Sequence, residues 1–460
     1  MTFDIPTNTL DEAMSASLSG TVVETTGMLA TVADFPAPVG AAVEIRTSSA
    51  ARIAAEVVGF KGRLTMISPF GSLAGVRKGH TVILRRTRRT LPVGDALLGR
   101  VLNAHGEAVD GRPQPARSSR RDLNPAPVPA IDRPRIDEAL PTGVRAIDGV
   151  LTCGRGQRLG VFAGAGVGKS TLLGMMARYS QADVIVIGLV GERGREVNEF
   201  LERDLGADGL RRSVVVVSTS NEPPLMRLQA AGAATAIAEH FRDQGKDVLL
   251  LIDSITRTAL ASRELGLAAG EPPTTRGFPP STFAMLPQLV ERAGRTPRGS
   301  ITAFYSVLVE GDDPNDPIAD TMRGLLDGHL WLSRDRAAKG FYPAIDVGQS
   351  ISRLMPELVP AEHLAAAGAV RRLIATRTEN EDLIAVGAYR RGADPAIDAS
   401  IELGPEIDQY LTQANQDHIT AEDAKQQLLA LGVKAAALLA RQRPTGPAPN
   451  EMTPNLRRAS

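Results

Sequence analysis

The chain has 460 residues, 52 basic and 52 acidic side chains with a formal net charge of zero, and a single cysteine, Cys153. This length is sufficient for two to four domains, and the balanced charge gives no indication of nucleic acid as a partner. One cysteine excludes an internal disulfide and a multi-cysteine metal site, so we expect a cytoplasmic protein.

The N-terminal part predicts a short flexible segment followed by a β-barrel. Residues 1–17 are polar, without the features of a signal peptide, and Leu10, Met14 and Leu18 have the spacing of a short amphipathic helix. Residues 18–92 contain six short β-rich runs between glycine and proline turns, which predicts a small closed barrel. These runs are GTVVET, LATVAD, AAVEIRT, RIAAEVVGF, RLTMIS and HTVILRR.

The rest of the chain predicts a linker, an α/β core and a helical domain. Residues 93–145 form the linker, because seven prolines between Gly111 and Gly143 exclude a continuous helix or central strand. Residues 146–355 alternate apolar strands with helix-length segments, typical of a parallel sheet covered on both faces. Residues 356–441 have helical periodicity, and 442–460 are predicted to be a disordered tail. Because no run of about 18 apolar residues occurs, any membrane association is expected to be peripheral.

The most specific motif is AGAGVGKST at 163–171, between the apolar run RLGVF and the helical run LLGMMA. A glycine-rich turn from a strand into a helix points backbone N–H groups at phosphates, and the helix adds its positive N-terminal end. Ala163 replaces the usual first glycine and is still small. The motif therefore predicts a phosphate-binding loop of a P-loop NTPase. Its predicted nucleotide-binding residues are Gly164, Ala165, Gly166, Val167, Gly168, Lys169, Ser170 and Thr171.

Two acidic residues follow buried strands and are expected beside this loop. Glu192 is a candidate to orient the water that attacks the γ-phosphate, and Asp253 is a candidate to hold Mg²⁺ together with Ser170. Lys169 would contact the β- and γ-phosphates. The alternatives are a surface ion pair of Glu192 with a neighbouring arginine, and a helix-capping role for Asp253.

Long segments resemble the ATPases of type III export systems, flagellar and virulence-associated, which are relatives of the F-type ATP synthase β subunit. The resemblance is carried by TGVRAIDGVLTCGRGQRLGVFAGAGVGKST, GERGREVNEF, FRDQGKDVLLLIDSITR, GEPPTTRGFPPSTFAMLPQLVERAG, GSITAFYSVLVEGDDPNDPIAD, GFYPAIDVGQSISRLM, LLGRVLNAHGEAVDG and DLIAVGAYRRGADPAID. It implies a RecA-like ATPase domain with an N-terminal barrel and a C-terminal helical domain, binding ATP and Mg²⁺.

The resemblance also assigns roles to three residues. Tyr342 would lie against the adenine, and Arg193 would support Glu192. Arg353 would reach into the site of a neighbouring subunit and neutralise charge on the γ-phosphate, which implies a homo-hexamer. From the residues alone, Tyr342 could be a packed core side chain and Arg353 a surface arginine.

The partners implied by the resemblance are those of an export apparatus at the inner membrane. They are a regulatory stator protein at the N-terminus, a central stalk touching the loops 270–281 and 310–316, an export gate, and chaperone–substrate complexes. The basic runs at 85–89 and 117–121 are expected to be solvated surface, with contact to acidic lipids as the alternative.

The function expected from these observations is ATP hydrolysis that energises export of flagellar components. A virulence-type secretion ATPase is the main alternative, and a rotary ATP synthase subunit is a further one. A Rho-type RNA translocase would need stacking aromatics in the barrel, where only Phe35, Phe60 and Phe70 occur. Glu192 argues against a noncatalytic ring subunit.

Overall fold

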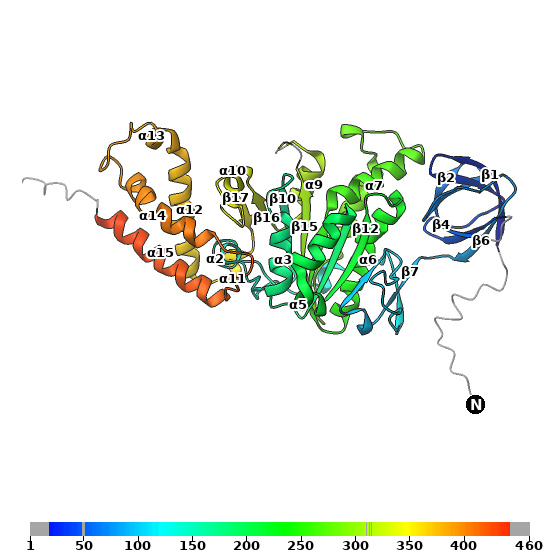
Figure 1. Cartoon of the computed structure of the whole chain (residues 1–460), viewed down its shortest axis with the longest axis horizontal. Coiled ribbons are helices and arrows are strands. Elements are labelled where there is room, and N and C mark those ends of the chain that lie inside the picture. The colour runs from blue at the N-terminus through cyan, green and yellow to red at the C-terminus, as the bar shows by residue number, and fades with distance from the viewer. Residues whose placement is uncertain are drawn as a thin grey trace, which may run out of the picture.

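The computed structural model describes residues 18–47, 51–116, 118–309, 311, 313 and 315–441. A barrel lies at one end of the molecule, a large sheet with its helices in the middle, and a group of helices at the other end (Figure 1). The predicted segment 1–17 and the predicted tail 442–460 lie outside the described residues.

The N-terminal barrel is the one predicted from the six β-rich runs. Its strands are antiparallel neighbours and close in the order β1-β2-β5-β4-β3-β6. Alternating side chains point inward, so Val22, Ile45 and Ile67 are fully buried. The strands are β1 Ser19–Thr26, β2 Leu29–Ala33, β3 Ala42–Arg46, β4 Arg52–Lys61, β5 Leu64–Pro69 and β6 Thr81–Arg86.

The linker contains short pieces of sheet. β7 (Thr90–Val93) pairs with β9 (Ser119–Asp122) as a two-stranded antiparallel sheet. β8 (Arg100–Leu102) joins the edge of the large sheet beside β12, which the apolar pattern did not predict because the strand has only three residues. The proline-rich stretch after Asp122 contains the short 3₁₀ turn η2 (Ala130–Asp132) and an isolated bridge from Ala139 to Gly154.

The large sheet has the order β17-β16-β10-β15-β13-β11-β12-β8, and β14 pairs with β15. The apolar strands predicted for this core are parallel, and they are β10, β11, β12, β13, β15 and β16. β17 at the edge is antiparallel to β16. The strands are β10 Arg158–Ala163, β11 Val184–Glu192, β12 Ser213–Thr219, β13 Asp247–Asp253, β14 Gly294–Arg295, β15 Ser300–Leu308, β16 Gly328–Leu332 and β17 Ile345–Ser352.

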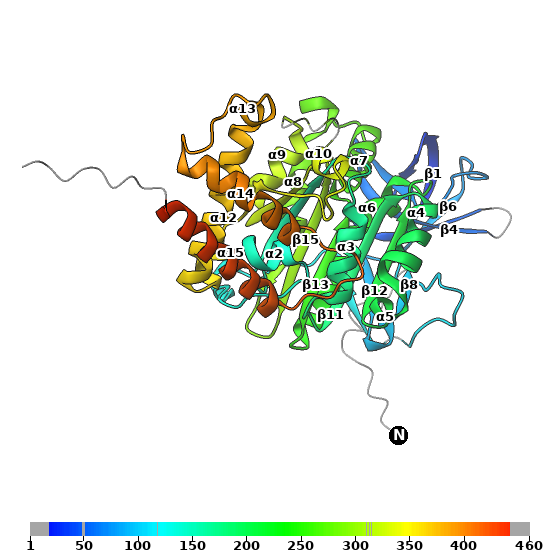
Figure 2. The same ribbon diagram turned by 60° about the vertical axis from the view of Figure 1, so that its left-hand side comes forward.

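Helices cover both faces of this sheet, as the near-continuous apolar strands predict (Figure 2). One face packs against α3 (Lys169–Tyr179) and the other against α6 (Pro224–Asp243), whose Ala230 and Ile237 are fully buried. The other core helices are α2 Arg145–Val150, α4 Gly194–Glu199, α5 Gly206–Arg211, α7 Ile255–Ala268, α8 Pro280–Val290, α9 Pro317–Leu325, α10 Arg334–Ala338 and α11 Met355–Leu358.

The C-terminal part is helical, as predicted. α12 (Ala361–Glu379), α14 (Pro395–Leu411) and α15 (Ala421–Arg441) pack on one another, and α13 (Glu381–Ala385) connects two of them. After α14 the chain turns back to the core, where the Gln413 amide donates to the carbonyl of Tyr342 over 2.8 Å. Among the described helices, none is both long enough and apolar enough to cross a membrane.

Candidate functional site

The phosphate-binding motif forms the turn between β10 and α3. Gly166 and Gly168 have φ angles of 78° and 89°, a region that favours glycine, and Gly168 is the residue before the first turn of α3. A Cβ atom at Gly164 would lie 2.6 Å from Nε of Arg334, so a larger residue here would displace the Arg334 side chain. Val167 is buried in the core, so only its backbone can face a ligand.

Lys169 and Asp253 form an ion pair at the mouth of this turn. Nζ of Lys169 donates to Oδ1 of Asp253 over 2.5 Å, and the Ser306 hydroxyl donates to the same oxygen over 2.6 Å. The cap of α7 is Ser254, which accepts from the Arg257 amide. Asp253 therefore does not cap this helix, and its carboxylate faces the loop lysine.

Glu192 lies at the end of β11, beside the same lysine. Its Oε1 is 4.0 Å from Nζ of Lys169 and 3.2 Å from Nε of Arg257. Arg193, the expected supporting arginine, instead pairs with Glu196 over 3.1 Å and its side chain is 73% exposed. The arginine that contacts Glu192 in the described part of the chain is Arg257, which sequence reasoning missed. Its position one turn into the helix after Asp253 was the available signal.

The environment of Glu192 favours its protonated form. Burial, with a smaller contribution from the charge of Asp253, raises the pKa of Glu192 to about 7 against the opposing effect of Lys169 and Arg257. This carboxyl group therefore titrates close to neutral pH, which is where a general base is most effective.

These groups surround a cavity of about 420 Å³ at the carboxyl edge of the sheet. Parallel strands and the helix starts that follow them converge at this edge, which is why residues far apart in the sequence meet here. The cavity is lined by Gly164, Ala165, Gly166, Gly168, Lys169, Ser170, Thr171, Leu189, Glu192, Arg193, Arg195, Glu196, Val197, Glu199, Phe200, Asp204, Asp253, Ser254, Arg257 and Leu308.

Tyr342 lies on the other side of the loop. The residue is 44% exposed, and a Cβ atom built on Gly168 would lie 3.2 Å from its ring. The Tyr342 side chain is therefore not a packed core residue, and its free ring surface is available for stacking beside the phosphate loop.

Arg353 lies at the opposite edge of the same sheet. Its amide donates to the Asp327 carbonyl over 3.0 Å, and the Asp327 amide donates to the carbonyl of Arg158, the first residue of β10. The phosphate loop follows the last residue of β10. The first and last residues of β10, Arg158 and Ala163, are five steps apart. At about 3.3 Å per residue, the two ends of this strand are separated by about 16 Å. Arg353 is therefore remote from the cavity of its own chain.

Arginines of both basic runs form ion pairs or ring contacts within the protein. Arg85 pairs with Glu44 over 2.7 Å, and Arg121 pairs with Asp243 over 2.6 Å. Arg89 is mostly buried, and its guanidinium lies 4.0 Å above the ring of Phe70. The expectation of a solvated surface holds for Arg85, which is exposed, but not for Arg89, which packs on the barrel, or for Arg121, which joins the linker to α6. Arg117 lies outside the described residues.

The two loops expected to face a stalk lie together. Arg276 of the first loop pairs with Asp313 of the second over 2.7 Å. In the second loop, residues 310, 312 and 314 lie outside the described residues.

The oxygen atoms at the cavity suit a hard divalent cation. Asp253 supplies a carboxylate and Ser170 a hydroxyl, and both line the cavity next to the loop that would hold phosphates. One Asp253 oxygen is occupied by Lys169 and Ser306, so the other remains for a cation or its water.

Two family models match the chain. Residues 143–352 match the ATP synthase alpha/beta family, nucleotide-binding domain, and residues 359–430 match the T3SS EscN ATPase C-terminal domain. The first match contains the phosphate loop, Glu192, Asp253 and Tyr342, and it ends one residue before Arg353.

Similar proteins cover most of the chain. A flagellum-specific ATP synthase of Bacillus subtilis is 48% identical over 405 residues, 88% of this chain and 91% of the relative. A type 3 secretion system ATPase of Xanthomonas euvesicatoria is 51% identical over 411 residues, 89% and 93% of the two chains. The solved structure of the assembled ATPase EscN in complex with its central stalk EscO, from enteropathogenic E. coli, has a TM-score of 0.83 and 43% identity, covering 90% of this chain and 100% of that chain.

Proposed function

We propose that this chain, which belongs to the ATP synthase alpha/beta family and within it to the flagellar and type III secretion ATPases, forms a ring whose ATP sites are each completed by a neighbouring copy. The chain is a P-loop ATPase, which binds ATP and hydrolyses it to ADP and phosphate. The observation that carries the ring proposal is the separation of Arg353 from the cavity of its own chain.

Within one chain, each group at the cavity has a distinct task. Backbone N–H groups of the loop and Lys169 bind the phosphates, and Tyr342 stacks on the adenine. Glu192 accepts a proton from, and orients, the attacking water, while Arg257 holds the carboxylate in place. This arrangement supports hydrolysis because the carboxylate and the lysine flank one cavity and Glu192 titrates near neutral pH.

Asp253 and Ser170 are the residues that would hold Mg²⁺. The cation would neutralise charge on the β- and γ-phosphates. Asp253 would use the carboxylate oxygen that Lys169 and Ser306 do not contact.

The ring we propose is a homo-hexamer. A head-to-tail contact brings the Arg353 edge of one copy to the cavity edge of the next, and such heterologous contacts close into rings. The positive charge of Arg353 then stabilises the γ-phosphate in the transition state, which is worth about 10³ to 10⁵ in kcat. The assembled state of EscN supports this arrangement.

We propose that this ring energises protein export, with flagellar components as its cargo and chaperone–substrate complexes and an export gate as partners. The flagellum-specific relative supports the flagellar assignment, and the 51% identity to the Xanthomonas secretion ATPase supports the virulence-type alternative. The ring would be cytoplasmic and associated peripherally with the inner-membrane export apparatus. A regulatory protein would bind the N-terminal segment, and a central stalk, as in the EscN complex, would contact the paired loops of Arg276 and Asp313.

Deletion of the gene tests the assignment. Loss of motility and of external filaments, restored by the wild-type gene and not by Glu192→Gln, supports flagellar export. Normal motility with loss of secreted effector proteins supports the virulence-type alternative and contradicts the flagellar one.

A further inference from the structure

The turn that carries Arg353 is fixed almost entirely through its backbone. The Arg353 amide donates to the Asp327 carbonyl over 3.0 Å, and the preceding residue, Ser352, closes the last β17 pair with Gly328. Within the described part of the chain, the exposed guanidinium of Arg353 makes one hydrogen bond of 3.4 Å, to the carbonyl of Arg323. The direction in which this side chain leaves the protein is therefore set by Asp327 and Ser352.

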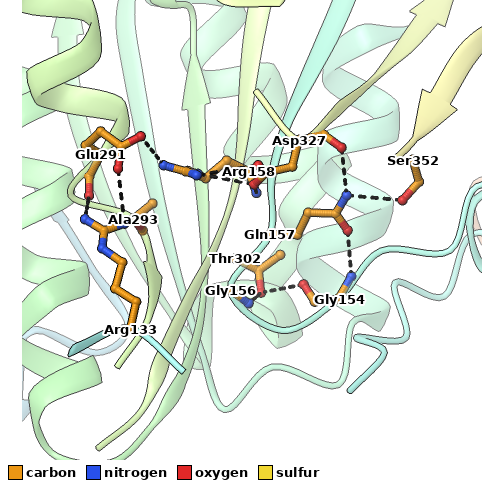
Figure 3. Close-up of polar contacts among 10 residues, drawn as sticks. All are labelled: Arg133, Gly154, Gly156, Gln157, Arg158, Glu291, Ala293, Thr302, Asp327 and Ser352. Carbon is orange, nitrogen blue, oxygen red and sulfur yellow. Dashed lines mark hydrogen bonds and ion pairs between the residues drawn. The ribbon is translucent and has the colours of Figure 1, made fainter. Parts of the chain in front are cut away.

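Both of these anchors are held by one buried side chain, Gln157. Its Nε2 donates to the Asp327 carbonyl over 3.2 Å and to the Ser352 hydroxyl over 3.1 Å, as Figure 3 shows. Its Oε1 accepts from the Gly154 amide over 2.8 Å. Gln157 is 0% exposed, so its amide has no access to water as a substitute partner.

The residues around this amide have little freedom to move. The Ser352 hydroxyl donates onward to the Thr152 carbonyl over 2.7 Å. The Asp327 carboxylate accepts from the Arg158 amide over 3.0 Å and from its Nε over 3.2 Å. Gln157 lies outside this turn and holds both Asp327 and Ser352, which fix the backbone of Arg353. A side chain in this position suits a role in orienting Arg353.

We propose that Gln157 is a positioning residue for Arg353, acting through Ser352 and Asp327. This inference rests on the proposed ring function, because Arg353 is taken to act on the γ-phosphate bound by the neighbouring copy. A displacement of about 1 Å at a reacting centre costs about 10²-fold in rate. Loss of the Gln157 amide would therefore damage the site of the neighbour and leave the cavity of its own chain intact.

The test uses full-length rings of Gln157→Met, which keeps the length of the side chain and removes its polar atoms. We expect kcat to fall by about 10²-fold, with the Kd for a fluorescent ATP analogue changed less than about twofold. Ser352→Ala removes only the hydroxyl and should lower kcat in the same way by a smaller factor. Ser300→Ala is the matched control: Ser300 is buried at the same edge of the sheet and donates to Asp247 instead, so its kcat should stay at the wild-type value.

The ATPase rates of rings mixed from two variants distinguish a positioning role of Gln157 from a purely structural role. Gln157→Met copies retain the cavity, whereas Lys169→Ala copies retain an intact Arg353, so about one quarter of the sites in an equal, random mixed ring are complete. Recovery of that share of activity supports the proposal. Wild-type kcat of Gln157→Met, or no recovery in rings shown to contain both copies, overturns it.

Two further outcomes are distinguishable. If Gln157→Met does not assemble, Ser352→Ala decides: reduced kcat that is rescued by mixing supports the proposal, and unchanged kcat overturns it. Wild-type kcat of Arg353→Ala rings would contradict the proposed ring function itself, whatever Gln157→Met does.

Discussion

Nε of Arg257 lies 3.2 Å from Oε1 of Glu192, and we propose that this arginine orients the carboxylate. Because the positive charge of Arg257 lowers the pKa of Glu192, its removal should shift the pH profile of kcat/KM to higher pH. We expect Arg257→Gln to lose about 10²-fold in kcat, the cost of removing one preorganised charged donor. Steady-state ATPase rates measured from about pH 5.5 to about pH 9 report both the loss in kcat and the shift of the pH profile.

Arg193→Gln is the comparison for this variant. Arg193 is exposed and pairs with Glu196, so its replacement should cost less than that of Arg257. A larger loss for Arg193→Gln would restore the role that the family resemblance implies for Arg193.

Glu192→Gln should keep ATP binding and lose turnover by about 10² to 10⁴-fold, the usual contribution of a general base. In the wild type, kcat/KM should fall about tenfold for each pH unit below the pKa, because the protonated carboxyl group cannot accept a proton from water. That pKa is about 7. A Glu192→Gln ring with the wild-type rate would show that another group performs this step.

Lys169→Ala should weaken ATP binding by about tenfold to a hundredfold, because hydrogen bonds to charged groups contribute about 1.5 to 3 kcal/mol. It should also destabilise the free protein by about 3 kcal/mol, since breaking a buried pair leaves Asp253 without its cation. Lys169→Ala/Asp253→Asn should recover most of this stability in urea unfolding and none of the affinity. Equal free energies of unfolding for Lys169→Ala and Lys169→Ala/Asp253→Asn would mean that the ion pair does not stabilise the fold.

Tyr342→Ala should weaken ATP binding by about tenfold, since stacking of a base on an aromatic ring contributes about 1 to 3 kcal/mol. Tyr342→Phe keeps the ring and should bind normally. Inorganic tripolyphosphate has no base, so its inhibition constant should be the same for all three proteins. A parallel loss of tripolyphosphate affinity in Tyr342→Ala would point to a disturbed phosphate loop instead of lost stacking.

The elements of the core could be predicted because their signals are local. Continuous apolar runs mark the six parallel strands, and the glycines of the phosphate loop mark the turn into α3. The short edge strand β8 and the antiparallel strand β17 carry no such signal, since their pairing depends on neighbours far along the chain. Periodicity alone does not locate strands of this kind.

The positions of the two acidic residues of the site could also be predicted from the sequence. Glu192 and Asp253 follow apolar strands, so the convergence of parallel strand ends predicts their meeting at one edge. The partner of Glu192 was assigned to its neighbour Arg193, although the helical turn after Asp253 brings Arg257 there instead. The network around Gln157 joins residues almost 200 positions apart and has no sequence signature.

The central claim is that Arg353 acts on the ATP bound by the neighbouring copy. Its most direct test is the ATPase rate of rings mixed from Arg353→Ala and Lys169→Ala copies, each nearly inactive alone. If the arginine acts across the interface, about one quarter of the sites in equal mixtures are complete and the rate rises to that share of the wild type. A mixed ring as inactive as its two components would contradict the claim.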